Sequence, residues 1–130
     1  MLNVKLTTGM VVTLLVIAQA QAESASDAYN QCMDNASSTL AMSSCIQAET
    51  RLQDQRLNRA YKQLTSTLES GAKKSLRDVQ RQWIAYRDAN CAFHVKASGG
   101  SMAQLEGGMC MMNMTRERAA ELERVLSPGQ

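Results

Sequence analysis

Apolar side chains recur every three or four positions along most of this chain, which is the spacing of one face of an α-helix. The longest runs with this spacing cover residues 40–70 and 73–97, and shorter runs cover 26–35 and about 112–126. Good helix formers dominate the chain as a whole, and the one proline, Pro128, lies near its end. We therefore predict an all-α fold of four helices.

Each of the three longer predicted helices carries a stripe of residues expected to face the core. In the first long helix the stripe has one offset near Leu57 and consists of Cys45, Ala48, Leu52, Leu57, Tyr61, Leu64 and Leu68. In the second it consists of Leu76, Val79, Trp83, Tyr86 and Asn90, and in the last of Met112, Thr115, Ala119, Leu122 and Leu126.

The stripes of the two long helices bring aromatic rings together. Trp83 and Tyr86 share one helix face, and Tyr61 lies on the stripe of the other helix. Because aromatic side chains contribute most to core burial, we expect these rings to form the core between the two helices. Asn58 and Arg87 lie at the edges of the stripes, where they are expected to hydrogen-bond across the helix pair.

Turn-forming residues separate the first three helices. Residues 35–39 (NASST) follow the first helix, whose N-cap is expected to be Ser26 or Asp27. Gly71 is expected to end the first long helix as a C′ residue. The link around Gly71 is then one or two residues long, which predicts that the two long helices form an antiparallel αα-hairpin. The last helix is expected to pack along this hairpin.

Glycines mark the segment before the last helix. Residues 98–101 (SGGS) end the second long helix, and Gly107-Gly108 marks a second break. The stretch 98–108 is therefore expected to be a loop. Thr115 is an alternative N-cap for the last helix, which would leave the methionine-rich stretch before it outside the helix.

The first 22 residues have the pattern of an export signal. Lys5 supplies a positive charge, and residues 10–18 (MVVTLLVIA) form an apolar run too short for a membrane anchor. Cleavage after Ala22 would leave residues 23–130, a length typical of a single domain. The leader predicts a periplasmic or secreted protein, and no cysteine would stand at the new N-terminus to carry a lipid.

Four cysteines follow the leader: Cys32, Cys45, Cys91 and Cys110. An even number of cysteines in an oxidising compartment indicates disulfides, for which three pairings exist. Cys32 and Cys45 flank the first predicted break, and Cys91 and Cys110 flank the double-glycine region. These positions favour Cys32–Cys45 with Cys91–Cys110, each worth roughly 3 kcal/mol in the chain-entropy model.

Charge narrows the choice of partner. Removing the leader leaves 13 basic and 12 acidic side chains, and the excess is concentrated in residues 49–88, which hold nine basic and five acidic residues. A nucleic-acid partner normally requires a much larger excess. No second apolar run is long enough for a membrane span, so we expect no stable membrane insertion after cleavage.

Two sequence elements resemble a known family. Residues 80–91 (QRQWIAYRDANC) are similar to the W-x-x-Y-R-D-x-x-C signature of the LprI-type lysozyme-inhibitor family, and residues 54–64 match its D-x-x-L-N-x-x-Y-x-x-L element. The remaining matches follow in order at Gly99, Gly100, Ser101, Cys110, Thr115 and Arg118. The resemblance extends from about residue 32 to 126, and it implies a single small exported helical domain with paired cysteines that binds a lysozyme or another cell-wall lytic enzyme.

An inhibitor of this kind needs no cofactor and no chemistry of its own, because it has only to occupy a cleft that holds two carboxylates. The candidate plug is the expected loop at 98–108, held at its base by Cys91–Cys110. Its polar groups are Ser98, Ser101 and Glu106. A second candidate surface for the protein partner consists of Tyr86, Arg87 and Asp88, since Tyr and Arg are common interface anchors.

Three alternatives stay open at this point. The segment with Met109, Cys110, Met111, Met112 and Met114, together with Met102 and His94, offers soft donors that suit Cu(I), although a disulfide would remove the Cys110 thiolate. The second alternative is an exported helical module that acts in stress or immunity and binds an unrelated partner. Catalysis is the third, but the Cys91/His94 pair has no evident orienting group, so we predict a protein that is not an enzyme.

Overall fold

The computed structural model describes residues 24–128 and shows four helices joined by short links. They are α1 (Asp27–Asn35), α2 (Thr39–Thr67), α3 (Ser70–Ser98) and α4 (Ala103–Leu126). Within these residues there is no strand, which confirms the all-α prediction. No helix in this part of the chain is long and apolar enough to cross a bilayer. The predicted signal peptide, 1–22, lies outside the described residues.

Serine side chains cap the first two helices. The Ser26 hydroxyl accepts a hydrogen bond from the Tyr29 amide at 3.1 Å, and the Ser38 hydroxyl accepts one from the Ala41 amide at 3.1 Å. Each bond satisfies an amide that has no partner within its own helix. The predicted cap at Ser26 and the predicted break before α2 are therefore confirmed.

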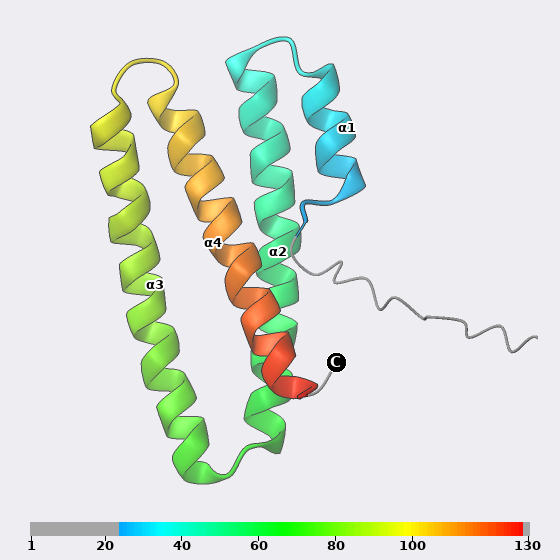
Figure 1. Cartoon of the computed structure of the whole chain (residues 1–130), viewed down its shortest axis with the longest axis vertical. Coiled ribbons are helices and arrows are strands. Elements are labelled where there is room, and N and C mark those ends of the chain that lie inside the picture. Colours follow the sequence, from blue (N-terminus) through cyan, green and yellow to red (C-terminus); the bar gives the residue numbers. More distant parts are fainter. Residues whose placement is uncertain (1–23, 129–130) are drawn as a thin grey trace, which may run out of the picture.

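The prediction that Gly71 ends the first long helix is wrong. Leu68 and Glu69 adopt extended backbone conformations and form the entire link between α2 and α3. Gly71 lies in the first turn of α3, where a side chain would meet nothing within 4 Å. The link still has the predicted length, and α2 and α3 run antiparallel as expected (Figure 1).

The hairpin is splayed, and α4 fills the space between its two arms (Figure 1). α4 packs most extensively on α2 and next on α3, whereas α2 and α3 contact each other least. α1 folds back on the first half of α2. The prediction that the last helix packs along the hairpin is confirmed, but the core lies against α4 rather than directly between α2 and α3.

Two apolar clusters make up this core. The first joins α2 to α4 through the buried residues Leu57, Ala60, Leu64, Ala119 and Leu122. Trp83, Tyr61 and Leu76 pack against it while staying partly exposed. The second cluster consists of Ile46, Leu105 and Met112, and α1 covers it with Tyr29 and Met33. α2 and α4 thus each bury one stripe, whereas the apolar residues of α1 and α3 that pack against these two helices are mostly half-buried.

The predicted stripes are shifted in two places. Ala48 and Leu52 are exposed, whereas their neighbours Glu49 and Gln53 are buried. With Glu49 and Gln53 included, the stripe runs without an offset from Ile46 to Leu57. On α3, Val79 and Tyr86 are exposed although both were expected in the core. The physical reason is that α4 covers α3 from the side that carries Leu76, Trp83 and Cys91.

The expected hydrogen bonds of Asn58 and Arg87 across the hairpin are not formed. Asn58 is exposed and donates to Asp54 of its own helix. Arg87 reaches Thr115 on α4 instead of α2. Both differences follow from the insertion of α4, which holds the facing sides of α2 and α3 apart.

Both predicted disulfides are confirmed. Cys32–Cys45 joins α1 to α2 with a Cα–Cα separation of 5.7 Å, and Cys91–Cys110 joins α3 to α4 with a separation of 5.5 Å. Each bond therefore connects two consecutive helices across the link between them. Together they restrain the two helix pairs at the end of the molecule that carries the α1–α2 and α3–α4 links (Figure 1).

Candidate binding surface

The expected loop at 98–108 is mostly helix. Only residues 99–102 lie between α3 and α4, and Gly99 and Gly100 both have positive φ values, 62° and 67°. We call residues 98–102 the tip. Ser101 is exposed, as is Met102, which retains 49% of its accessible surface. The Ser98 hydroxyl hydrogen-bonds the Glu106 carboxylate, which connects the two helices at the base of the tip.

The prediction that Gly107-Gly108 breaks the chain is wrong, because both glycines lie inside α4. A Cβ atom on Gly107 would overlap the Cγ2 atom of Val95, and one on Gly108 would lie 3.2 Å from Ile46 Cγ2. The pair of glycines therefore allows α4 to approach α3 on one side and α2 on the other. The two glycines serve close helix packing and do not interrupt the helix. α4 therefore begins at Ala103 and is longer than the predicted helix at 112–126.

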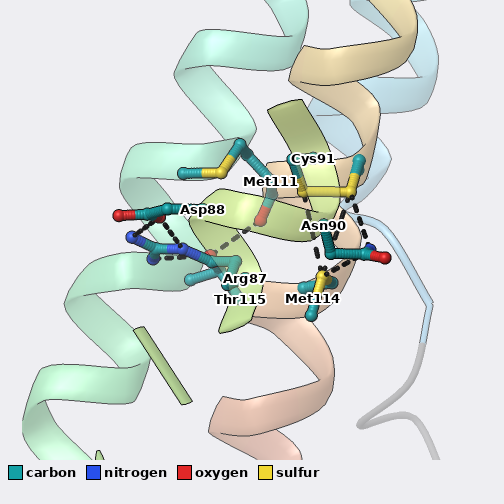
Figure 2. The surroundings of a disulfide bond; sticks show 8 residues. Arg87, Asp88, Asn90, Cys91, Met111, Met114 and Thr115 are labelled. Carbon is teal, nitrogen blue, oxygen red and sulfur yellow. Dashed lines mark hydrogen bonds and ion pairs between the residues drawn. A yellow bond between two sulfur atoms is a disulfide. The ribbon is translucent and has the colours of Figure 1, made fainter. Parts of the chain in front are cut away.

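Thr115 is likewise in the middle of α4 and does not cap it. Its side chain is buried and its hydroxyl donates to the Met111 carbonyl at 2.7 Å. It also accepts a hydrogen bond of 3.5 Å from the Arg87 guanidinium. Thr115 is thus the α4 partner of the W-x-x-Y-R-D element on α3 (Figure 2).

The Cys91–Cys110 disulfide lies about two helical turns below the tip and has polar and thioether neighbours (Figure 2). Asn90 donates to Cys110 Sγ at 3.6 Å and to Met114 Sδ at 3.4 Å. Met114 Sδ is also 3.8 Å from Cys91 Sγ. These contacts fill the space beside the disulfide, so the covalent link is part of a packed interface between α3 and α4.

Two arginines stack against one tryptophan in the same interface. The guanidinium carbon of Arg87 is 5.0 Å from the Trp83 ring centroid, and that of Arg118 is 6.0 Å from it. Arg118 is buried and bonded to Gln80 at 3.0 Å and to Glu121 at 2.7 Å. Both cations stabilise the fold through ring and hydrogen-bond contacts. The burial of Arg118 was not predicted, although the family resemblance had included this residue.

The predicted partner-binding trio does not share one surface. Arg87 packs inward on Trp83, and its guanidinium is paired with Asp88 through bonds of 2.8 and 2.9 Å. Tyr86 lines a groove of about 420 Å³ between α3 and α4 together with Glu117 and Glu121. Arg87 and Asp88 both line a different groove of about 340 Å³, which also contains Gly107. Of the three, Tyr86 is the residue with the most exposed side chain.

A buried carboxylate that the sequence did not predict lies near the other side of the core. Glu49 is 3% exposed, and it accepts hydrogen bonds from the Ser26 amide at 3.0 Å, the Ser26 hydroxyl at 2.5 Å and the Gln53 amide group at 2.8 Å. Burial by itself would raise the pKa of Glu49. The hydrogen bonds from Ser26 and Gln53, together with the charge of Arg116, outweigh burial and lower this pKa below its ordinary value of 4.5.

The same network continues to the end of α4. Gln53 accepts a bond of 3.1 Å from Arg56, whose guanidinium forms an ion pair with Glu123 that includes a hydrogen bond of 2.7 Å from Nε. A chain of polar contacts therefore links the N-cap of α1, α2 and α4. The one sign of this network in the sequence was the offset in the predicted stripe of the first long helix. The polar residues Glu49 and Gln53 occupy the positions that complete this stripe.

The methionines of the candidate copper segment diverge. Met112 is buried with Ile46 and Leu105, whereas Met114 lies against the disulfide on the side of α3. Cys110 is bonded to Cys91 and has no thiolate to offer. Within residues 24–128 no group of three or more His, Cys, Asp or Glu side chains is placed to hold a metal ion. Met112 and Met114 thus contact different helices, and the segment packs three helices together.

Comparison with known proteins places the chain in a family. Residues 32–122 match the family described as lysozyme inhibitor LprI. An uncharacterized protein of Rhizobium meliloti (strain 1021) is 28% identical over 107 residues, a match that covers 72% of this chain and 77% of the relative. No solved structure gives a significant match. The description of the family names it as one of lysozyme inhibitors. Because the family match spans most of the chain and includes all four bonded cysteines, the chain belongs to the LprI lysozyme-inhibitor family.

Proposed function

We propose that this chain is exported and that it inhibits a peptidoglycan hydrolase of the lysozyme type. Family membership supports the class of target. The leader-like pattern of residues 1–22 supports a periplasmic or secreted location, in which both disulfides would persist. The observation that carries the proposal is the narrow tip between α3 and α4. Contacts between these two helices hold the tip in place.

Three contacts restrain the tip. The Cys91–Cys110 disulfide joins its two helices, Gly107 packs against Val95 between the disulfide and the tip, and Ser98 bonds Glu106 at its base. A binding segment that is already ordered avoids a cost of about 0.5–1.5 kcal/mol for each side chain that would otherwise be immobilised. The tip is therefore suited to bind as a preformed shape.

The shape of the tip fits a cleft that admits a polysaccharide. Gly99 and Gly100 add no side chains, so the tip is narrow, and Ser101 and Met102 are exposed. A lysozyme-type hydrolase needs two carboxylates and a water molecule at the base of an open cleft. A protein that fills this cleft excludes the substrate without any reaction of its own, which agrees with a family of inhibitors.

The test is a lysis assay on cell-wall substrate with the oxidised protein and two matched variants. Ser101→Trp enlarges the tip, and Ser70→Trp places the same side chain at an exposed position at the opposite end of α3. We expect the unmodified chain and Ser70→Trp to slow lysis equally, and Ser101→Trp to weaken inhibition by roughly tenfold or more, as loss of a central contact does. Unchanged lysis at micromolar concentrations of the unmodified chain would refute the proposed function. Equal inhibition by both variants would refute the role of the tip.

A further inference from the structure

α3 has a long face that nothing in the described chain covers. Of its 29 residues, Cys91 is the one that is buried. Val79, Tyr86 and Phe93 are 45%, 62% and 63% exposed, and they follow one another at intervals of seven residues. Seven residues are close to two turns, so these three side chains lie in one line along the helix. α4 covers α3 from a different side, through Trp83 and Cys91, and Tyr86 lies at the edge between the two sides, where it also lines the groove with Glu117 and Glu121.

The line continues through small and polar residues. The positions Ser75, Val79, Gln82, Tyr86, Ala89, Phe93 and Lys96 are all exposed and alternate in steps of four and three. We call this set the outer seam. Its members between Ser75 and Phe93 carry no charge. Steps of four and three define the a and d positions of a heptad, which is the pattern that a helix uses to pack along a second helix.

From this we infer that the outer seam binds the outer seam of a second copy of this chain, with the two α3 helices antiparallel. In an antiparallel pair, the a positions of one helix pack against d positions of the other. Tyr86 then faces Ala89 of the second copy, and Phe93 faces Gln82 of the second copy. Each large ring meets a smaller or flexible side chain, as interdigitating packing requires. A two-fold axis repeats every contact, so the interface closes as a dimer.

Charge favours the same arrangement. In this register Val79 faces the aliphatic part of Lys96 of the second copy. Asp78 directly precedes Val79, so it lies beside Lys96 of the second copy at the edge of the contact. The Asp78 side chain is 43% exposed, and its present partner is Lys74 at 2.8 Å. The Lys96 ammonium can therefore pair with the carboxylate of the other chain, and symmetry forms this pair twice.

A parallel pair would place like charges together. Lys73, Lys74, Arg77 and Arg81 all lie in the first half of α3, where Asp78 is the single acidic residue between them. Parallel helices would bring both basic halves side by side and would set Lys96 next to its own copy. Antiparallel helices place the basic halves at opposite ends of a contact about 30 Å long, beyond the range of screened repulsion at physiological salt.

Sedimentation equilibrium on the oxidised protein tests the inference. We expect twice the chain mass at about 200 µM, and we expect Tyr86→Glu to weaken association by roughly tenfold or more, because it places a charge at the centre of the contact. Ile84→Glu is the matched control: Ile84 is an exposed apolar residue of α3, but it lies away from the seam. A monomer at the highest concentration, or equal effects of the two variants, would overturn the inference.

A charge exchange tests the register. Asp78→Lys and Lys96→Asp should each weaken the dimer, and the double variant should restore it, because the pair then forms with its charges reversed. Failure of the double variant to recover would refute the antiparallel register. Circular dichroism of each variant shows whether its helices remain folded. None of these measurements depends on the hydrolase, so the dimer and the proposed inhibition succeed or fail separately.

Discussion

Among the helical glycines that the structure describes, Gly107 is expected to be the one least able to accept a side chain. A Cβ atom there would overlap Cγ2 of Val95, because α4 packs closely on α3 at this position. Forcing one methyl group into a packed interface costs about 1–3 kcal/mol. Alanine regains about 1 kcal/mol relative to glycine inside a helix. Since the overlap is severe, we expect Gly107→Ala to lower the free energy of unfolding by about 2 kcal/mol.

Two other glycines serve as controls for the same substitution. Gly71→Ala adds a methyl group where nothing lies within 4 Å, so it should stabilise α3 by about 0.5–1 kcal/mol. Gly108→Ala meets Ile46 Cγ2 at 3.2 Å, a contact that a small shift can relieve, so its effect should fall between the other two. The order of stability among the variants is therefore Gly71→Ala, Gly108→Ala and Gly107→Ala, with Gly71→Ala above and Gly107→Ala below wild type.

A second substitution shows whether Gly107→Ala loses stability through the overlap with Val95 or through a general effect on α4. Val95→Ala removes the methyl group that the new Cβ would meet, so the double variant Gly107→Ala/Val95→Ala should recover most of the loss. We expect a coupling energy of about 1–2 kcal/mol between the two positions. The assay is urea unfolding of the oxidised proteins, followed by circular dichroism at 222 nm, a wavelength dominated by helix. Additive effects of the two substitutions would refute close packing as the reason for Gly107.

Two further predictions concern stability. Replacing Cys91 and Cys110 together by alanine should lower the free energy of unfolding by roughly 3 kcal/mol, measured by urea unfolding against the same replacement of Cys32 and Cys45. Because the pKa of Glu49 is lower in the folded than in the unfolded chain, its carboxylate should stabilise the fold above about pH 4.5 and lose this effect as the pH falls through the folded pKa. The stability difference between wild type and Glu49→Gln should therefore shrink between pH 7 and pH 3, and a constant difference would contradict this reading.

The partner surface could be only partly predicted from the sequence. Ser98, Ser101 and Glu106 do lie at the α3–α4 end, because the glycines at 99–100 identified where α3 stops. The extent of the loop could not be predicted, because glycine marks both a chain reversal and a close helix contact. Gly99 has a positive φ and lies in the chain reversal, whereas Gly107 lies where α4 packs closely on Val95 of α3.

The sequence by itself determined the features that depend on neighbours along the chain. Helix formation follows from local propensity and from bonds between residues four apart, so all four helices, the Ser26 cap and the length of the α2–α3 link were predictable. Both disulfides followed as well, because each joins consecutive helices across one short link.

Only the tertiary structure decided which side of each helix is covered. A stripe of apolar residues shows that a helix has an inner face, but it does not show which helix packs there. Insertion of α4 turned Trp83 inward and left Tyr86 exposed on the same helix. Burial of Glu49 depends on Ser26, which lies 23 residues away in sequence. A buried charge is stable only with such a partner, and no local pattern shows that the partner will be present.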